Sequence, residues 1–179
     1  MSESEQTPGD ADRDADAVVA DCIAAGREAM ADISDYDQAA ADRLVKAAAW
    51  AVYKEAHAES LVETTMDATG MGRPRHKRQK LRDRTKGILV DALGEPSVGE
   101  IPCDRDGVVK IAKPVGVVGG LVPSTNPAST AVNLAILALK GRNALVLSAS
   151  PGGIAPTAEA VEYIREELAE VGAPRDLVQ

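Results

Sequence analysis

The sequence contains no phenylalanine, one tryptophan and three tyrosines, so aromatic side chains contribute little to its core. Apolar residues still make up 45% of the chain, which is normal for a globular protein. The core must therefore be built from alanine, valine, leucine and isoleucine. With 179 residues, the chain is long enough for one ordinary domain with its own core.

Cysteine is also scarce, since only Cys22 and Cys103 occur and they form no CxxC pair. This spacing argues against a disulfide framework or a metal site, and it favours reduced thiols in a cytoplasmic protein. No apolar run reaches the roughly 18 residues that a membrane-spanning helix needs. The acidic first residues also lack the basic and then apolar order of a secretory signal. We therefore predict no contact with a membrane.

Positive charge is in the minority, because 20 Lys and Arg residues face 28 Asp and Glu residues. The net charge of −8 argues against a general nucleic-acid or anionic-membrane surface. Residues 73–86 form the only basic cluster in the sequence. They contain no aromatic residues of the kind that alternate with basic ones in many nucleic-acid-binding surfaces. We interpret this cluster as a solvated helix face, with a phosphate or an acidic partner as the alternative. His57 and His76 have no neighbouring acid–nucleophile pattern and are interpreted as structural or surface residues.

Composition and periodicity divide the chain into four parts and predict an α/β fold. Residues 1–16 are acidic and polar, which is typical of a disordered tail. Residues 17–96 carry apolar residues at helical spacing. Residues 97–113 predict two short strands around an Asp-Gly turn. Residues 114–179 predict the first βαβα unit of a Rossmann-like parallel sheet.

Within the helical part, Ser34–Asp35 is the expected N-cap of a helix from Tyr36 to Ala58. A further helix is expected from about Glu59, ended by Gly70 in the left-handed conformation.

Two strands that each end in a small polar elbow dominate the last part of the chain. The first strand, Val115–Val122, is apolar on both faces, as a central parallel strand is. The elements that follow it are a Pro123–Pro127 elbow, a helix to Gly141, a strand at Ala144–Leu147, an elbow at Ser148–Gly153, a helix from Pro156 or Thr157 to about Val171, and the start of a third strand at Leu177–Gln179. Because the chain stops as this strand begins, we expect the front part of a longer protein.

The carboxyl ends of such strands form a crevice where nucleotides and anions bind. Gly116, Gly119 and Gly120 lie within the first strand rather than at its turn, so the phosphate-loop fingerprint GxGxxG is absent. These glycines favour close helix–sheet packing as the simpler explanation. Asn126 in the first elbow could donate a hydrogen bond to a developing oxyanion or could equally cap the helix.

Several stretches together resemble the acylating, coenzyme A-dependent branch of the aldehyde dehydrogenase superfamily. They are Asp67-Ala68-Thr69-Gly70-Met71-Gly72, Glu100-Ile101, Lys110–Val118, Pro123–Thr130, Ala138–Ala144 and Gly172-Ala173-Pro174. The resemblance extends from about residue 17 to the end. It implies an incomplete cofactor domain, with residues 97–113 as part of an oligomerisation hairpin in a homo-oligomer. It also implies oxidation of a small aldehyde to an acyl-CoA through a cysteine thiohemiacetal and thioester, with NAD, or NADP as the alternative, taking the hydride. A bacterial microcompartment is the alternative to a cytoplasmic location.

The resemblance also implies roles for single residues. Leu121, Val122, Pro123 and Ser124 match the nicotinamide side of the cofactor site, and Ser148, Ala149, Ser150 and Pro151 match its adenosine side. Ser148 stands where non-acylating relatives carry a lysine, in agreement with the acylating branch. That branch often has Pro-His-Pro where this chain has Ala149-Ser150-Pro151, which leaves the adenine and CoA contacts open.

The expected oxyanion donor is Asn126, with Thr125 as the alternative because the position shifts by one residue between branches. Neither Cys22 nor Cys103 matches the family's nucleophile, so we expect the chain alone to be inactive. A hypothesis of another class is a non-catalytic module that binds a nucleotide or a partner. A third, weaker hypothesis is that residues 1–33 form an encapsulation or docking peptide.

Overall fold

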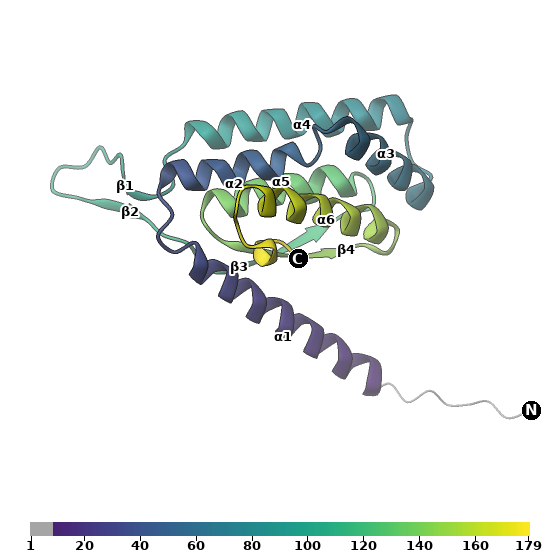
Figure 1. Ribbon diagram of the computed structural model, residues 1–179, viewed down its shortest axis with the longest axis horizontal. Helices are drawn as coiled ribbons and strands as arrows, with labels where there is room; N and C mark the ends of the chain where they lie inside the picture. The colour runs from purple at the N-terminus through teal and green to yellow at the C-terminus, as the bar shows by residue number, and fades with distance from the viewer. Residues whose placement is uncertain (1–8) are drawn as a thin grey trace, which may run out of the picture.

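The computed structural model describes residues 9–179, and side-chain burial from residue 15 onward. Helices make up most of this part of the chain, with a short antiparallel hairpin and a small parallel sheet (Figure 1). In chain order the elements are α1 Gly9–Asp32, α2 Gln38–Trp50, α3 Glu55–Thr69, α4 Pro74–Gly94, β1 Gly99–Ile101, β2 Lys110–Ala112, β3 Val117–Val122, α5 Pro127–Lys140, β4 Ala144–Ala149, η1 Pro151–Gly153, α6 Ile154–Glu170 and η2 Arg175–Leu177.

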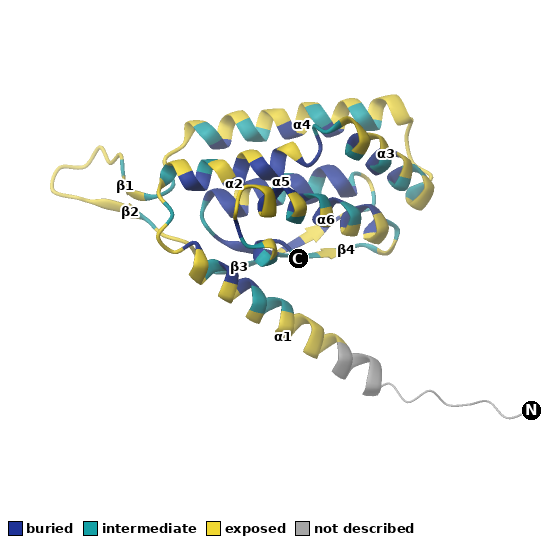
Figure 2. Cartoon of the chain, in the orientation of Figure 1, coloured by how far each residue is buried: buried dark blue, intermediate teal, exposed yellow. Residues whose placement is uncertain are grey.

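The core lies between α2, α4, α5 and α6, which stack on one side of the parallel sheet (Figure 1). Buried residues are concentrated on α2, α5 and α6, whereas the hairpin tip and residues 15–21 of α1 are exposed (Figure 2). Alanines supply much of this core and let the helix axes approach closely. Between them lie larger, fully buried side chains such as Leu44, Ile136 and Leu168. Each contributes about 1.5–3 kcal/mol through burial.

The helical part differs from the sequence-based prediction at three boundaries. Helix α1 begins at Gly9, earlier than the predicted start near residue 17, and residues 1–8 of the predicted tail lie outside the described part. The N-cap of α2 is Asp37 rather than Ser34–Asp35, and its carboxylate accepts a hydrogen bond from the Ala40 amide at 2.7 Å.

The predicted helix from Tyr36 to Ala58 is in fact two helices. The chain turns at residues 51–54, and α3 begins at Glu55. Ala51 and Val52 are fully buried within this turn, so the apolar pattern continues across the break and conceals it. At the other end of α3, Gly70 adopts φ 60° as the C-cap, which confirms the predicted glycine stop.

The strands confirm the predicted α/β fold class and the hairpin. β1 pairs antiparallel with β2, with Gly99 opposite Ala112. β3 and β4 run parallel, in register from Val117 opposite Ala144 to Val122 opposite Ala149. Val178 forms a parallel bridge with Leu145 on the other edge of β4, so the predicted third strand is present as a single bridge, while Leu177 lies in η2.

The two faces of β3 differ, which corrects the prediction that both are buried. On the helix side, a Cβ added to Gly120 would lie 2.7 Å from Leu147 Cδ2, so this glycine permits close packing. On the opposite side, Gly26 of α1 packs against Val117 and Ala144 at the start of the strands. Beyond that point Gly119 meets open space, and Leu121 is 82% exposed. The sheet is therefore uncovered on one face at its carboxyl end.

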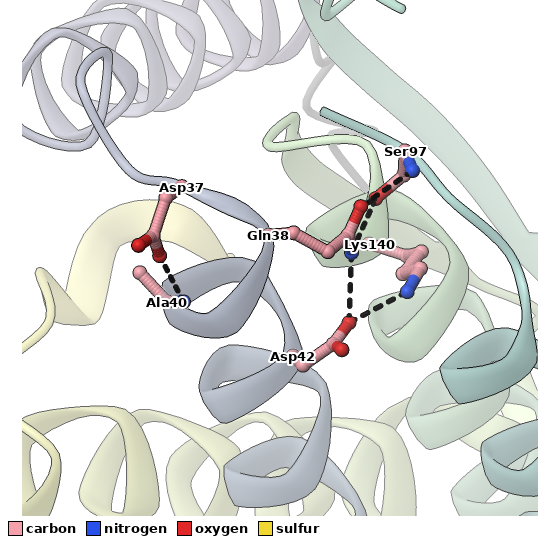
Figure 3. A network of polar contacts seen from close by, with 6 residues as sticks. All are labelled: Asp37, Gln38, Ala40, Asp42, Ser97 and Lys140. Carbon is pink, nitrogen blue, oxygen red and sulfur yellow. Dashed lines mark hydrogen bonds and ion pairs between the residues drawn. The ribbon is translucent and has the colours of Figure 1, made fainter. Parts of the chain in front are cut away.

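A polar network fastens the C-terminal end of α5 to α2 and to the chain that leads into the hairpin (Figure 3). Buried Lys140 donates to the Asp42 carboxylate at 2.6 Å, and Gln38 Nε2 donates to the same oxygen at 3.0 Å. The Gln38 carbonyl oxygen accepts a hydrogen bond from the Ser97 amide at 2.7 Å. These contacts compensate the cost of burying the lysine charge.

Candidate functional site

The first elbow joins β3 to α5 and places Asn126 at the helix N-cap. The Asn126 carbonyl oxygen accepts hydrogen bonds from the Thr130 amide at 3.0 Å and the Thr130 hydroxyl at 2.8 Å. The Asn126 side chain makes no capping hydrogen bond and is half-buried. The side-chain amide of Asn126 therefore does not cap α5, which was the structural alternative in the sequence-based prediction.

The second elbow, after β4, packs directly against the first. The Ser150 amide donates to the Val122 carbonyl oxygen at 2.9 Å, and the Ser150 and Ser124 hydroxyl oxygens are 2.7 Å apart. Gly152 and Gly153 allow this approach, because a Cβ on Gly152 would lie 3.2 Å from the Ser124 hydroxyl oxygen. The structure thus brings the two predicted elbows together at the carboxyl ends of the parallel strands.

The residues matched to a cofactor occupy this edge of the sheet with different degrees of exposure. Leu121 and Ser148 are direct neighbours in the parallel ladder, and both are exposed on the uncovered face. Val122 is buried in the core instead, at 3% exposure. The remaining residues are exposed (Pro123, Pro151) or half-buried (Ser124, Ala149, Ser150).

The edge offers an apolar, uncovered surface of the kind on which a nucleotide lies in an open α/β sheet. Exposed Leu121 and the open space above Gly119 provide it. Next to β4, a groove lined by Leu147, Ala149 and Thr157 contains a buried Thr157 hydroxyl without a hydrogen-bond partner. These features fit a nicotinamide dinucleotide.

One part of the site was not predicted from sequence: the first two turns of α4 lie against the first elbow. Lys77 Nζ donates to the Thr125 carbonyl oxygen at 2.5 Å. Burial lowers the pKa of Lys77, and the nearby Lys80 charge lowers it further. The basic cluster was visible in the sequence, but nothing local indicated that Lys77 reaches a residue 48 positions away.

Lys77 and Lys80 form part of a groove that opens beside Asn126, which we call the cationic groove. Its volume is about 510 Å³, and it is lined by Met71, Gly72, Arg73, His76, Lys77, Lys80, Thr125 and Asn126. This lining contains no carboxylate. His76, interpreted from sequence as a structural or surface residue, is exposed and borders this groove.

Two arginines on the side of α4 that faces α3 have carboxylate partners. Arg78 forms ion pairs with Glu55 and Glu59 of α3, and Arg82 Nη2 lies 2.5 Å from a Glu55 carboxylate oxygen. The predicted solvated basic face is therefore divided into a side that pairs with α3 and a side that borders the groove. His57 is structural, because its ring stacks on Tyr163 with centroids 3.8 Å apart and its Nδ1 lies 3.0 Å from the Ala51 carbonyl oxygen.

Neither cysteine lines the cationic groove. Cys22 is half-buried on α1, and Cys103 is exposed between the hairpin strands. Within residues 9–179, no three His, Cys, Asp or Glu side chains are grouped so as to hold a metal ion. In the same part of the chain, no helix has both the length and the apolar character for a membrane crossing.

Comparisons with known proteins agree with this geometry, although no family model matches the sequence. The sulfoacetaldehyde dehydrogenase (acylating) of Cupriavidus necator is 41% identical over 162 residues, covering 90% of this chain and 33% of its own length. The crystal structure of an acetylating aldehyde dehydrogenase from Geobacillus thermoglucosidasius superimposes with a TM-score of 0.87 at 32% identity, covering 94% of this chain and 37% of that one.

An engineered glycolyl-CoA reductase with bound NADP+ shares the fold, with a TM-score of 0.68 at 22% identity, covering 88% of this chain and 35% of that one. The chain spans about a third of the length of the relatives it matches. It belongs to the acylating branch of the aldehyde dehydrogenase superfamily.

Proposed function

We propose that this chain forms the front part of the cofactor domain of an NAD(P)-dependent, CoA-acylating aldehyde dehydrogenase. The proposal rests on the meeting of the two elbows. There the Asn126 side-chain amide, which makes no capping hydrogen bond, lies at the same sheet edge as exposed Leu121 and Ser148. The homology to acylating relatives supports the reaction class. The reaction that we propose for the whole enzyme is oxidation of an aldehyde to an acyl-CoA.

In this proposal the Asn126 amide donates a hydrogen bond to the aldehyde oxygen as negative charge develops on it. Its half-buried position in the elbow holds it in place without using it as a helix cap. Thr125 is the alternative donor, but its carbonyl is bound by Lys77 and its side chain is exposed. The structure therefore favours Asn126.

The nicotinamide cofactor, once bound, supplies the acceptor for the hydride that leaves the aldehyde carbon. Leu121, Pro123 and Ser124 would form the wall beside the nicotinamide, and the Ser148–Pro151 segment the wall beside the adenosine. Val122 contributes only its backbone, because its side chain is buried in the core. Titration with NAD and with NADP would decide between the two cofactors.

We further propose that the chain does not oxidise aldehydes by itself, because neither Cys22 nor Cys103 borders the groove at Asn126. The hairpin, with exposed Val108, Val109 and Ile111, would extend the sheet of a neighbouring subunit in a cytoplasmic or microcompartment-bound oligomer.

The test is a chimera that joins this chain to the remaining two thirds of the Cupriavidus necator relative. The chimera should reduce NAD or NADP in the presence of an aldehyde and CoA, whereas the chain alone should not. Asn126→Ala in the chimera should lower kcat by about 100- to 1,000-fold, as loss of one oxyanion donor does. Thr125→Ala is the matched control and should lower it far less.

The proposal would be wrong if the folded chimera failed to turn over any aldehyde, or if the chain alone were active. Calorimetric binding of NAD or CoA to the chain together with an inactive chimera would instead favour a non-catalytic binding module. If Thr125→Ala had the larger effect, Thr125 would take the oxyanion role.

A further inference from the structure

We propose that the cationic groove binds the negatively charged end of a small anionic aldehyde, a sulfonate or a carboxylate, while Asn126 faces the aldehyde oxygen. This inference rests on the proposed function and names the substrate class of the same site. It assigns Arg73, His76, Lys77 and Lys80 as residues that determine specificity.

The spacing of these four residues is the first argument. Positions 76, 77 and 80 follow helical spacing that places side chains on one side of α4, and Arg73 is the N-cap residue directly before them. All four line the same groove together with Asn126. Their charged or hydrogen-bonding ends therefore converge on one space.

The absence of compensating charge is the second argument. Among the ion pairs within residues 9–179, none involves Arg73, Lys77 or Lys80, whereas Arg78 and Arg82 on the other side of α4 pair with α3 carboxylates. The chain carries 28 acidic residues, so acids are not in short supply. The groove is thus a local excess of positive charge in a protein whose net charge is −8.

The position of the groove is the third argument. It opens at the N-terminal end of α5, where the unpaired amides of a helix already create positive potential. Burial lowers the pKa of Lys77, and repulsion by the Lys80 charge lowers it further. A bound anion would remove this repulsion and would use the groove's donors in charge-assisted hydrogen bonds.

The size of the groove limits the ligand. A volume of about 510 Å³ lies in the range of small-molecule sites, roughly 300–1,000 Å³. An aldehyde of a few carbons with a terminal sulfonate or carboxylate fits such a space between Asn126 and Arg73. A neutral aldehyde of the same length would leave the cations without a partner.

The test uses the complete 179-residue chain, labelled with ¹⁵N, and ethanesulfonate as the probe. Ethanesulfonate should cause saturable shifts of the amides at residues 71–73, 75–77 and 125–126, and the neutral ethyl methyl sulfone should not. Lys80→Gln should weaken ethanesulfonate binding at least about fivefold, as expected for loss of one charge-assisted contact. Lys86→Gln removes one charge from the same helix outside the groove, and it should change the affinity by less than about twofold.

Three results would overturn the inference. One is no saturable shift with ethanesulfonate, and another is an equal response to the sulfone or an equal loss in both variants. The third is that CoA shifts the same amides at lower concentration than ethanesulfonate, which would assign the groove to the phosphates of CoA. These outcomes are independent of turnover. An active chimera without sulfonate binding refutes the groove alone, and sulfonate binding with an inactive chimera refutes the enzymatic function alone.

Discussion

A lysine lies at each end of α5, and the charges of the two lysines are compensated differently. At the C-terminal end, buried Lys140 pairs with Asp42 and lies in the last turn, where the helix dipole favours a cation. At the N-terminal end, Lys77 from α4 donates to the Thr125 carbonyl and has Lys80 beside it. Lys140 therefore has a carboxylate partner, whereas among residues 9–179 Lys77 forms no ion pair. Sites that leave charge uncompensated in this way are where ligands are expected.

The largest effect on stability is expected at the C-terminal end of α5, from removing the carboxylate partner of Lys140. Asp42→Ala should destabilise the chain by about 2–3 kcal/mol, because Lys140 would stay buried without a partner. This is somewhat below the cost for a fully buried pair, since the Asp42 side chain is 23% exposed. Urea denaturation would measure the loss. The double variant Asp42→Ala/Lys140→Met should regain most of it, and a single variant as stable as the parent would show that the pair is not structural.

A smaller effect is expected from the link between this end and the hairpin. Gln38→Ala should cost about 1 kcal/mol, because the Ser97 amide loses its acceptor. Hydrogen exchange at Ser97 should become faster, while Gln79→Ala on the exposed side of α4 should leave it unchanged. Unchanged exchange in Gln38→Ala would mean that the network does not hold the hairpin.

The smallest effect on stability is expected at the N-terminal end of α5, next to Lys77 and Lys80, and it should have the opposite sign. Lys80→Gln should raise the free energy of unfolding by up to about 0.5 kcal/mol at low salt, because it removes a cation from the positive end of α5. Lys86→Gln should change it less, as this residue does not line the groove. If Lys80→Gln destabilised the chain as Asp42→Ala does, the contrast between the two ends would disappear.

Elements with a strong local signal were predicted well. The parallel strands, the hairpin and the Gly70 stop follow from apolar runs, an Asp-Gly turn and a left-handed glycine. The break at residues 51–54 was missed because Ala51 and Val52 continue the apolar pattern through the turn. The early start of α1 was missed because residues 9–16 are acidic and carry no apolar period.

The parts of the candidate site that depend on residues close together in the chain were also predictable from sequence. Both elbows and Asn126 could be found from sequence, since each elbow directly follows its strand. The exposure of Leu121 and the burial of Val122 could not, because they depend on which face of β3 the helices cover. The roles of Thr125 and Asn126 and the cofactor contacts remain predictions for the chimera to test.

The sequence by itself determined the order of the elements, the fold class and the two elbows, because these follow from patterns among residues close together in the chain. Only the tertiary structure decided that Lys77 reaches Thr125, that Lys140 reaches Asp42 and that the basic helix has two electrostatically different sides. Those contacts join residues 48 and 98 positions apart, and such separations leave no periodic trace in a sequence.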